Sequence, residues 1–218
     1  MMSKLWLTRT RPAADESAQV WRDAGFDPLV APLLEIEPVL HDPLPADAVI
    51  IFTSKNGVDH VVCGKQRAIC VGDATAEKAK TAGYKDVISV DGTSLDVTDW
   101  ILENLPKTQS IIHVSGWHVR GSIIEDLIEA GYSAQRVIAY HSVPSSIWPD
   151  VPFSSVVFYS PLAAKTFADI AIDMCIDISK VTAICISQAT ADELSALALP
   201  SIRIAKRPRE DELIMAAK

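Results

Sequence analysis

Small, hydroxyl-bearing and basic residues are concentrated in short turns that follow apolar runs of the sequence. One phrase occurs twice, as ICVGDATAEKAKTAGY at 69–84 and as ICISQATADELSALAL at 184–199, and both copies keep the small residues and the Thr of the turn. A turn that leads into a helix offers unpaired backbone N–H groups and the positive end of the helix dipole. These turns therefore predict binding of carboxylates or phosphates. Six turns share this character: TRTRP (8–12), TSKNG (53–57), VGDAT (71–75), VSGWHVR (114–120), YSP (159–161) and ISQAT (186–190).

A structural role for the same hydroxyl groups is the alternative interpretation. Ser and Thr are favoured at helix N-caps, where the side-chain oxygen accepts a backbone N–H. Thr190 together with Glu193 also fits the spacing of a capping box. Capping and ligand binding are compatible, so this alternative does not exclude a binding role. The residues expected to cap helices are Ser54, Thr75, Ser160 and Thr190.

Signatures of several common enzyme classes are missing from the sequence. It contains no G-x-G-x-x-G, G-x-x-x-x-G-K-[ST] or G-x-S-x-G, which removes the dinucleotide, nucleotide and hydrolase interpretations. The five histidines have no metal-ligand spacing, and His113 is expected inside a strand. The four cysteines form no C-x-x-C pair and lie in or beside apolar stretches, so we expect buried thiols, with no disulfide and no metal site. They are Cys63, Cys70, Cys175 and Cys185.

Composition and charge narrow the choice of partner. Apolar residues make up 49% and charged residues 22% of the 218 residues, which is the balance of an ordinary globular protein. The formal net charge of −8 argues against a nucleic-acid partner. No apolar run approaches the roughly 20 residues that span a bilayer. The start, MMSKLWLTRTRP, reaches Arg9 before a signal-like region forms, so we expect a cytoplasmic protein with no membrane partner.

Apolar runs alternate with helical patterns along the whole chain. The runs AVIIF, AICV, SVVFY and TAICI are short and continuous, which is typical of strands buried on both faces of a parallel sheet. One expected helix places Ala14, Ala18 and Trp21 on its buried face and ends before Gly25. A second expected helix buries Ile124, Leu127 and Ile128 and ends before Gly131. The predicted fold class is therefore α/β, with parallel sheets flanked by helices.

Landmarks repeat along the chain at one offset, which indicates a duplication. FTSKN at 52–56 corresponds to FYSPL at 158–162, an offset of 158 − 52 = 106, and Pro38 corresponds to Pro144 at the same offset. Pro-rich segments at 31–45 and 141–152 follow the second strand of each half and are typical of connections between domains. Two such connections predict a domain inserted into a split one. We expect residues 1–36 and 144–218 in the split domain and residues 37–143 in the inserted domain.

The order of these motifs resembles that of the uroporphyrinogen-III synthase family over nearly the whole chain. The resemblance implies two similar α/β domains joined by a two-stranded linker, with the active site in the interdomain cleft. It rests on seven segments: LTRTRP, FTSKNGV, VGDATA, the turn from Gly116 to Arg120, AGYSAQRVIAYHSVP, FYSPLAAKTF and AICISQATADEL.

The resemblance implies a reaction in tetrapyrrole (heme) biosynthesis. The linear tetrapyrrole hydroxymethylbilane loses its terminal hydroxyl group as water and leaves an azafulvene. Ring D attacks this electrophile through its substituted carbon, which forms a spirocyclic pyrrolenine. Fragmentation and reclosure then give uroporphyrinogen III with ring D inverted, whereas closure without an enzyme gives isomer I. The implied enzyme class is a cyclising hydro-lyase.

Site residues follow from the motifs that match the family. The Tyr of the family's Y-x-t-x-P segment matches Tyr140 in AYHSVP and is the candidate proton donor to the departing hydroxyl group. The alternative for Tyr140 is a half-buried aromatic at a strand end, and the alternative for Arg9 is a solvated surface side chain. The residues implied to bind the substrate carboxylates are Arg9, Thr53, Ser54, Lys55, Asn56, Gly72, Thr75, Gly116, Arg120, Ser160 and Thr190.

The chain departs from the family pattern at two places. Ser187 stands where the family usually has Gly, which predicts a turn less open to a close ligand contact. The segment VVCGKQRAICVG leaves little room for a helix after Val58. Neither departure changes Tyr140.

Two other function classes compete with the enzyme. A non-catalytic small-molecule binding or regulatory module on the same fold is the main alternative, because a fold does not establish a function. A sugar-binding protein is disfavoured by the low aromatic content of 6%. For the enzyme we expect no cofactor, a monomer, and room for a transient contact with the preceding pathway enzyme.

Overall fold

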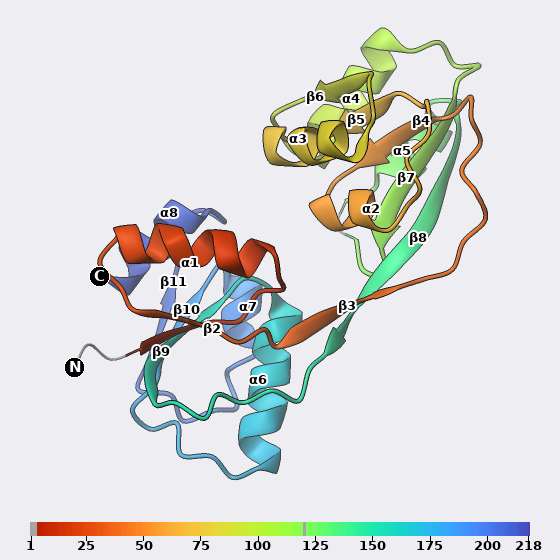
Figure 1. Cartoon of the computed structure of the whole chain (residues 1–218). Helices are drawn as coiled ribbons and strands as arrows, with labels where there is room; N and C mark the ends of the chain where they lie inside the picture. Colours follow the sequence, from red (N-terminus) through yellow and green to blue (C-terminus); the bar gives the residue numbers. More distant parts are fainter. Residues whose placement is uncertain (1–3, 120) are drawn as a thin grey trace. The chain divides into compact units, whose positions relative to one another are not determined.

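The protein consists of two compact units that each combine a sheet with helices. The computed structural model describes residues 4–119 and 121–218. Unit 1 combines Met1–Glu35 with Val143–Lys218, and unit 2 is formed by Ile36–Ser142 (Figure 1). Each unit therefore draws on chain segments of its own and closes its own hydrophobic core.

The chain passes from one unit to the other within two paired strands. These are β3 (Leu34–Pro38) and β8 (Ser133–Pro144), which are neighbours in the sheet of unit 2. The Val39 N–H donates to the Ala139 carbonyl at 2.8 Å, and the Ser145 N–H donates to the Leu33 carbonyl at 2.9 Å. Because residue numbers rise along one segment as they fall along the other, β3 and β8 run antiparallel.

Unit 1 contains a five-stranded sheet in the order β11-β10-β9-β1-β2, and all four pairings are parallel. The side chains of Leu5, Trp6 and Leu7 are at most 3% exposed, as expected for a strand that is covered on both faces. The strands are β1 (Lys4–Leu7), β2 (Pro28–Val30), β9 (Phe153–Phe158), β10 (Thr182–Cys185) and β11 (Ser201–Ile204). The helices are α1 (Ala13–Asp23), α6 (Pro161–Asp173), α7 (Gln188–Asp192) and α8 (Glu210–Ala217).

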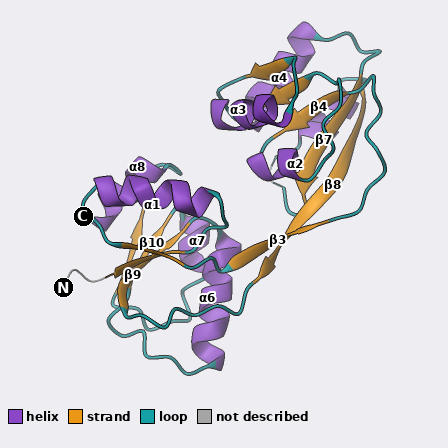
Figure 2. Ribbon diagram, in the orientation of Figure 1, coloured by secondary structure: helices purple, strands orange, loops and turns teal. Residues whose placement is uncertain are grey.

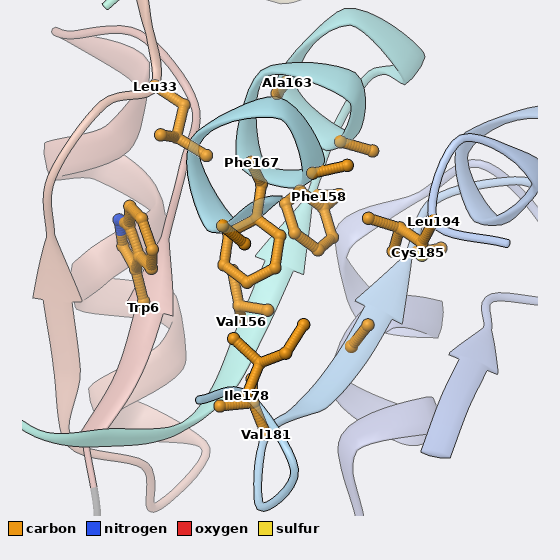
Figure 3. Close-up of a cluster of buried hydrophobic side chains, with 14 of the residues drawn as sticks. Trp6, Leu33, Val156, Phe158, Ala163, Phe167, Ile178, Val181, Cys185 and Leu194 are labelled. Carbon is orange, nitrogen blue, oxygen red and sulfur yellow. The ribbon is translucent and has the colours of Figure 1, made fainter. Parts of the chain in front are cut away.

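Alternate strand residues of unit 1 face two separate helix layers. Trp6 and Phe158 pack with α6 and α7, and the ring of Phe167 on α6 lies 5.7 Å from Trp6 and 5.2 Å from Phe158 between centroids (Figure 3). Leu5 and Leu7 pack on the opposite face, against α1 and α8. Burial of this apolar surface on both faces is the main term that stabilises the sheet.

Unit 2 contains a six-stranded sheet in the order β3-β8-β7-β4-β5-β6. The pairings among β4, β5, β6, β7 and β8 are parallel. Helices α2 and α3 cover one face, where Phe52 is buried, and α4 and α5 cover the other, where Ile51 is buried (Figure 2). The strands are β4 (Val49–Phe52), β5 (Ala68–Cys70), β6 (Val87–Ser89) and β7 (Ser110–Gly116), besides β3 and β8. The helices are α2 (Lys55–Asp59), α3 (Asp73–Ala82), α4 (Ser94–Asn104) and α5 (Ile123–Glu129).

The two sheets share one strand order. Taken from the same end, β11-β10-β9-β1-β2 in unit 1 corresponds to β6-β5-β4-β7-β8 in unit 2, with β3 added at the edge of unit 2. Each unit thus joins one βαβ segment to one βαβαβ segment. The duplication predicted from the sequence appears here as two sheets with the same topology, and the expected α/β class with parallel sheets is confirmed.

The predicted helix faces are partly right. Ala14, Ala18 and Trp21 are buried on α1, as the spacing predicts. On α5 the buried residues are Ile123 and Leu127, while the Ile128 side chain is 54% exposed, so the prediction for Ile128 is wrong. The helix begins at Ile123, and its buried face passes through positions 123 and 127. The Ile128 side chain lies next to this face and not on it.

Both of these helices end where the sequence predicts, at glycines with positive φ, Gly25 at 91° and Gly131 at 90°. Within the described residues, no helix has the length and apolar character needed to cross a membrane.

The two ends of α3 provide a matched pair of glycines for a stability test. Gly83 follows the helix with φ of 109°, whereas Gly72 precedes it with φ of −158°, which any residue adopts. An added Cβ would meet nothing within 4 Å at Gly72 and only the Cys63 sulfur at 3.4 Å at Gly83. Gly83→Ser should therefore lower the free energy of unfolding by about 1–2 kcal/mol, the cost of the left-handed conformation for an L-residue.

The control is the same substitution at the other end of the helix. Gly72→Ser should change the free energy of unfolding by only a few tenths of a kcal/mol, because Ser is a favoured N-cap. Urea unfolding followed by circular dichroism measures both values. Equal losses for the two variants would contradict the assignment of strain to Gly83.

Candidate functional site

The predicted binding turns lie at the carboxyl ends of the parallel strands in each unit. In unit 2, residues 53–56 follow β4, Gly72 follows β5 and Gly116 ends β7. In unit 1, Arg9 follows β1, Ser160 follows β9 and Ser187 follows β10. Because parallel strands end at the same edge, each sheet gathers its turns there, which is where ligands bind in open α/β sheets. Arg120 lies outside the described residues.

Ser54 and Ser160 are the N-caps of equivalent helices. The Ser54 Oγ accepts the Asn56 N–H at 3.2 Å, and the Ser160 Oγ accepts the Ala163 N–H at 3.2 Å. The structural interpretation of these two hydroxyl groups is confirmed. Each cap takes one first-turn N–H, and Pro161 at the start of α6 has none. What these two turns offer to a carboxylate is therefore the rest of the first-turn N–H groups and the positive end of the helix dipole.

Thr75 and Thr190 are not caps, and this part of the prediction is wrong. The N-caps of α3 and α7 are Gly72 and Ser187, and the two threonines occupy the third helical position. Thr75 is 6% exposed and Thr190 is fully buried, with its Oγ1 3.0 Å from the Ser187 Oγ. The capping-box spacing of Thr190 and Glu193 misleads because the N-cap lies three residues earlier, at Ser187.

The turns that contain Gly72 and Ser187 have the same backbone geometry. Gly72 has φ and ψ of −158° and 168°, and Ser187 has −160° and 165°. Ser187 therefore needs no distortion at the position where the family usually has Gly. Its side chain instead supplies a hydroxyl group that bonds to Thr190.

A β-bulge sets the direction of the Tyr140 side chain. Along β8, Ile138 pairs with Ser115 but Tyr140 pairs with Gly116, so Ala139 is one extra residue on β8. A bulge re-aims the side chains that follow it. Tyr140 accordingly packs with the core on the α2 and α3 face, where it is 9% exposed.

Gly116 and His60 form the immediate surroundings of the Tyr140 ring. A Cβ added to Gly116 would lie 2.8 Å from Tyr140 Cε2 and 2.9 Å from Cζ, so only glycine leaves room for the phenol. The His60 ring lies 5.5 Å from the Tyr140 ring between centroids, and its Nδ1 is 2.7 Å from the Asn56 carbonyl oxygen. Three segments distant in sequence thus meet around this phenol: the end of α2, the end of β7 and the bulge in β8.

Arg136 holds the turn after β7 and was missed by sequence reasoning. Its Nε donates to the Ser115 Oγ at 2.8 Å, and its Nη2 donates to the Gly116 carbonyl at 2.6 Å and to the Trp117 carbonyl. These bonds fix the backbone against which Tyr140 packs. The available signal was a lone Arg next to the apolar run VIAY, because a charged residue in such a strand needs a partner.

His113 supports the start of the turn at 53–56 from inside the sheet. It lies in β7, as expected, is 2% exposed, and its Nε2 is 3.0 Å from the Thr53 Oγ1. Burial lowers the pKa of His113 to about 4, and the nearby Arg136 acts in the same direction. The imidazole is therefore neutral at neutral pH, and its hydrogen bond positions the Thr53 hydroxyl group.

Arg9 in unit 1 is 34% exposed and is held by several partners. Its Nη1 donates to the Ser17 Oγ at 3.0 Å, its Cζ lies 4.6 Å from the centre of the Tyr159 ring, and Glu210 Oε2 is 3.9 Å away. The Tyr159 hydroxyl donates to Glu210 Oε1 at 2.9 Å and accepts from Trp21 Nε1 at 2.9 Å. Burial, followed by the charge of Glu210, raises the pKa of Tyr159 far above its usual value. The surface interpretation of Arg9 is thus partly right, since the side chain is one third exposed but belongs to a network in which Glu210 is the acidic partner.

The cysteines differ in exposure. Cys70 and Cys185 are buried in strands, and burial raises the pKa of each thiol to about 12. Cys175 is exposed in the turn after α6, so the expectation that every thiol is buried is wrong. Across residues 4–119 and 121–218, no three His, Cys, Asp or Glu side chains are grouped so that they could hold a metal ion.

Comparison with known proteins shows the family. The family model described as "Uroporphyrinogen-III synthase HemD" matches residues 15–215. The chain belongs to the uroporphyrinogen-III synthase family. Its members are enzymes of tetrapyrrole biosynthesis, and the resemblance found in the sequence is confirmed.

Solved structures of the same family share the fold. The uroporphyrinogen-III synthetase of Helicobacter pylori has a TM-score of 0.64 and 20% identity, with 100% of this chain and 98% of that chain covered. A mutant uroporphyrinogen III synthase of the extremely thermophilic bacterium Thermus thermophilus has a TM-score of 0.50 and 15% identity, with 99% and 97% covered. No curated protein matches the chain.

The buried His113 makes the stability of this synthase-family protein depend on pH. Its pKa is about 4 in the folded protein and about 6.5 in the unfolded chain, so between these values the unfolded chain binds more protons. The stabilisation is complete above about pH 6.5 and is lost as the pH falls toward 4. His113→Gln should remove this dependence, so that lowering the pH from about 7.5 to about 5 destabilises the wild type by roughly 2 kcal/mol more than the variant.

Urea unfolding of both proteins at the two pH values measures this difference. His41→Gln is the matched control, because His41 is partly exposed and should respond to pH as the wild type does. Parallel pH profiles for the wild type and His113→Gln would contradict the lowered pKa.

Proposed function

We propose that this family member converts hydroxymethylbilane to uroporphyrinogen III with inversion of ring D, as a cyclising lyase that releases water. The observation that carries the proposal is the placement of Tyr140. The bulge in β8 and the absence of a side chain at Gly116 hold its phenol at the sheet edge where the binding turns lie. A general acid held at a ligand-binding edge is the group that departure of a hydroxide requires.

The proton of Tyr140 is transferred to the leaving oxygen in the first step. The C–O bond breaks, water departs, and the electron pair of the adjacent pyrrole nitrogen forms the azafulvene, which keeps its N–H proton and carries the positive charge opposite the phenolate. The substituted carbon of ring D then attacks the methylene carbon, which gives the spirocyclic pyrrolenine. Fragmentation and reclosure at the other carbon of ring D end in loss of a ring proton, and this proton restores the phenol. The substrate supplies both nucleophile and leaving group, so the protein has mainly to hold the reactive geometry.

The carboxylates of the substrate are bound by the turns at the two sheet edges. In unit 2 the donors are the first turn of α2 beside the Ser54 cap and the first turn of α3 beside Gly72. In unit 1 they are the corresponding turns of α6 and α7. Thr53, Lys55, Asn56, Thr75, Ser160 and Thr190 belong to these segments or adjoin them. Gly116, at the end of β7, and Arg120 complete the proposed set of binding residues.

Arg9 is a further counter-charge in unit 1. A substrate carboxylate that approaches Arg9 exchanges with Glu210, whose Oε2 is 3.9 Å from the guanidinium in the structure. The Tyr159 ring and Ser17 keep the guanidinium in place during this exchange.

We further propose that the protein acts as a cytoplasmic monomer. The residues proposed for binding and for proton donation all belong to one copy of the chain, which supports a monomer. The buried thiols of Cys70 and Cys185 suit a reducing compartment. Because hydroxymethylbilane closes to isomer I without an enzyme, a transient contact with the enzyme that supplies it would limit this loss.

The product isomer tests the reaction directly. When hydroxymethylbilane is generated in the presence of the protein and the products are oxidised and separated, we expect isomer III to predominate. Protein heated to denaturation is the control and should leave only isomer I. Isomer I alone with the native protein would refute the proposal and support a non-catalytic binding module on the same fold.

Tyr140→Phe tests the proton donor. The substitution keeps the ring that packs on Gly116 but removes the proton, so formation of isomer III should slow by roughly 10²-fold or more, the range of a lost general acid. Tyr132→Phe is the matched control, because Tyr132 is buried in the same unit and its hydroxyl donates to the Leu105 carbonyl at 2.8 Å. Unchanged turnover in a folded Tyr140→Phe protein would remove Tyr140 as the donor.

A further inference from the structure

Trp117 is an exposed aromatic side chain on a fixed backbone. Its N–H donates to the Tyr140 carbonyl at 2.9 Å, and its own carbonyl accepts from Arg136. Despite these anchors the indole is 57% exposed. An aromatic side chain that stays in solvent contributes little burial energy to the fold, so its surface is available to a ligand.

The indole borders an open hollow of about 360 Å³ at the end of β7 and β8. Besides Trp117, the hollow is lined by His118, His141 and Ser142. Its volume falls within the range of small-molecule sites and is sufficient for one five-membered aromatic ring with short acid side arms. His141 and Ser142 directly follow Tyr140 along β8, so the hollow lies beside the backbone that carries the proposed proton donor.

Two imidazoles give the hollow polar groups that suit carboxylates. Glu37 Oε2 lies 3.2 Å from the His141 Nε2 and orients the ring. With Nε2–H donating to Glu37, the Nδ1 donates to a second carboxylate when the ring carries both protons. His118 is exposed beside the indole. An aromatic platform flanked by hydrogen-bond donors matches an aromatic ring that bears anionic substituents.

We propose that this hollow is a subsite for one pyrrole ring of the substrate. Trp117 stacks on the ring, and His118 and His141 bind its acetate and propionate groups. The inference rests on the proposed function, which makes a tetrapyrrole the substrate. The subsite adds to that function the residues that hold one pyrrole ring near the β8 backbone at Tyr140. Trp117 lies in the turn VSGWHVR (114–120), where the sequence motifs singled out Gly116 and Arg120 but not the indole.

A monopyrrole with one acetate and one propionate group is a probe that separates this subsite from catalysis. The chain has five tryptophans, so a ¹⁵N-labelled protein has five indole N–H signals, and the Trp117 signal is the one missing from Trp117→Phe. The Trp117 signal should shift in a saturable manner as the monopyrrole is added, and the other four should stay in place. Trp117→Ala should weaken binding roughly tenfold or more, the effect of a lost stacking partner, and Trp117→Phe should retain most of it.

The matched control is Trp100→Phe, which changes a partly exposed Trp on α4 and should bind the monopyrrole as the wild type does. With hydroxymethylbilane, Trp117→Ala should raise KM about tenfold and change kcat less, as expected for loss of a binding contact.

Two results would overturn the subsite. One is a Trp117 signal that does not respond to the monopyrrole, or equal binding by Trp117→Ala and the wild type. The other is a Trp117 signal that shifts with protein concentration in the absence of probe, since this would make the hollow a contact between two copies of the chain. The isomer assay decides the function separately: isomer III without a Trp117 response refutes the subsite alone, and isomer I alone refutes the function whatever the NMR shows.

Discussion

The parallel pairing of β1 with β9 joins chain segments that are about 150 residues apart, and the architecture of unit 1 depends on it. Leu5 to Leu7 pair with Ser155 to Val157, so the βαβ segment at the start of the chain becomes part of the sheet formed by its last third. In unit 2 the equivalent pairing joins β4 to β7. Parallel pairing also places the carboxyl ends of all these strands at one edge of each sheet. The turns proposed to bind the substrate are therefore gathered by the same hydrogen bonds that close the units.

The duplicated turns have kept their backbone conformation, whereas their side chains and the helices that follow them differ. Gly72 and Ser187 differ in side chain yet share one backbone conformation, because both are N-cap residues and extended φ and ψ are typical of that position. The helices behind these turns differ more, since they have only to cover the sheet with an apolar face. The backbone N–H groups of such a turn are present whichever side chains the turn carries. A polyanionic substrate can thus be bound by segments whose sequences have diverged.

The chemistry proposed for Tyr140 depends on a close approach of its ring to the backbone of residue 116, which only glycine permits. Tyr140 lies against Gly116 at a distance where a Cβ would overlap the ring, and Arg136 holds the carbonyl groups of Gly116 and Trp117. The same backbone carries the proposed acid and the proposed stacking platform, because the Trp117 N–H is bonded to the Tyr140 carbonyl. The positions of the two side chains are therefore coupled through the backbone of the turn.

The sequence by itself determined the α/β class, the parallel sheets, the duplication and the family, because these depend on hydrophobic period, on turn residues and on the order of motifs along the chain. It also located the turns and the capping roles of Ser54 and Ser160, which are set within a few residues. The tertiary structure alone decided the direction of Tyr140, because an extra residue in β8 becomes a bulge only against its partner strand β7. It likewise decided the partners of Arg9 and Arg136, since these bonds join residues that only folding brings together. Thr190 shows where prediction from local spacing fails, because a sequence pattern that fits a helix cap lies inside the helix. The pairing of β10 with β9 fixes where the strand ends and therefore where the helix begins.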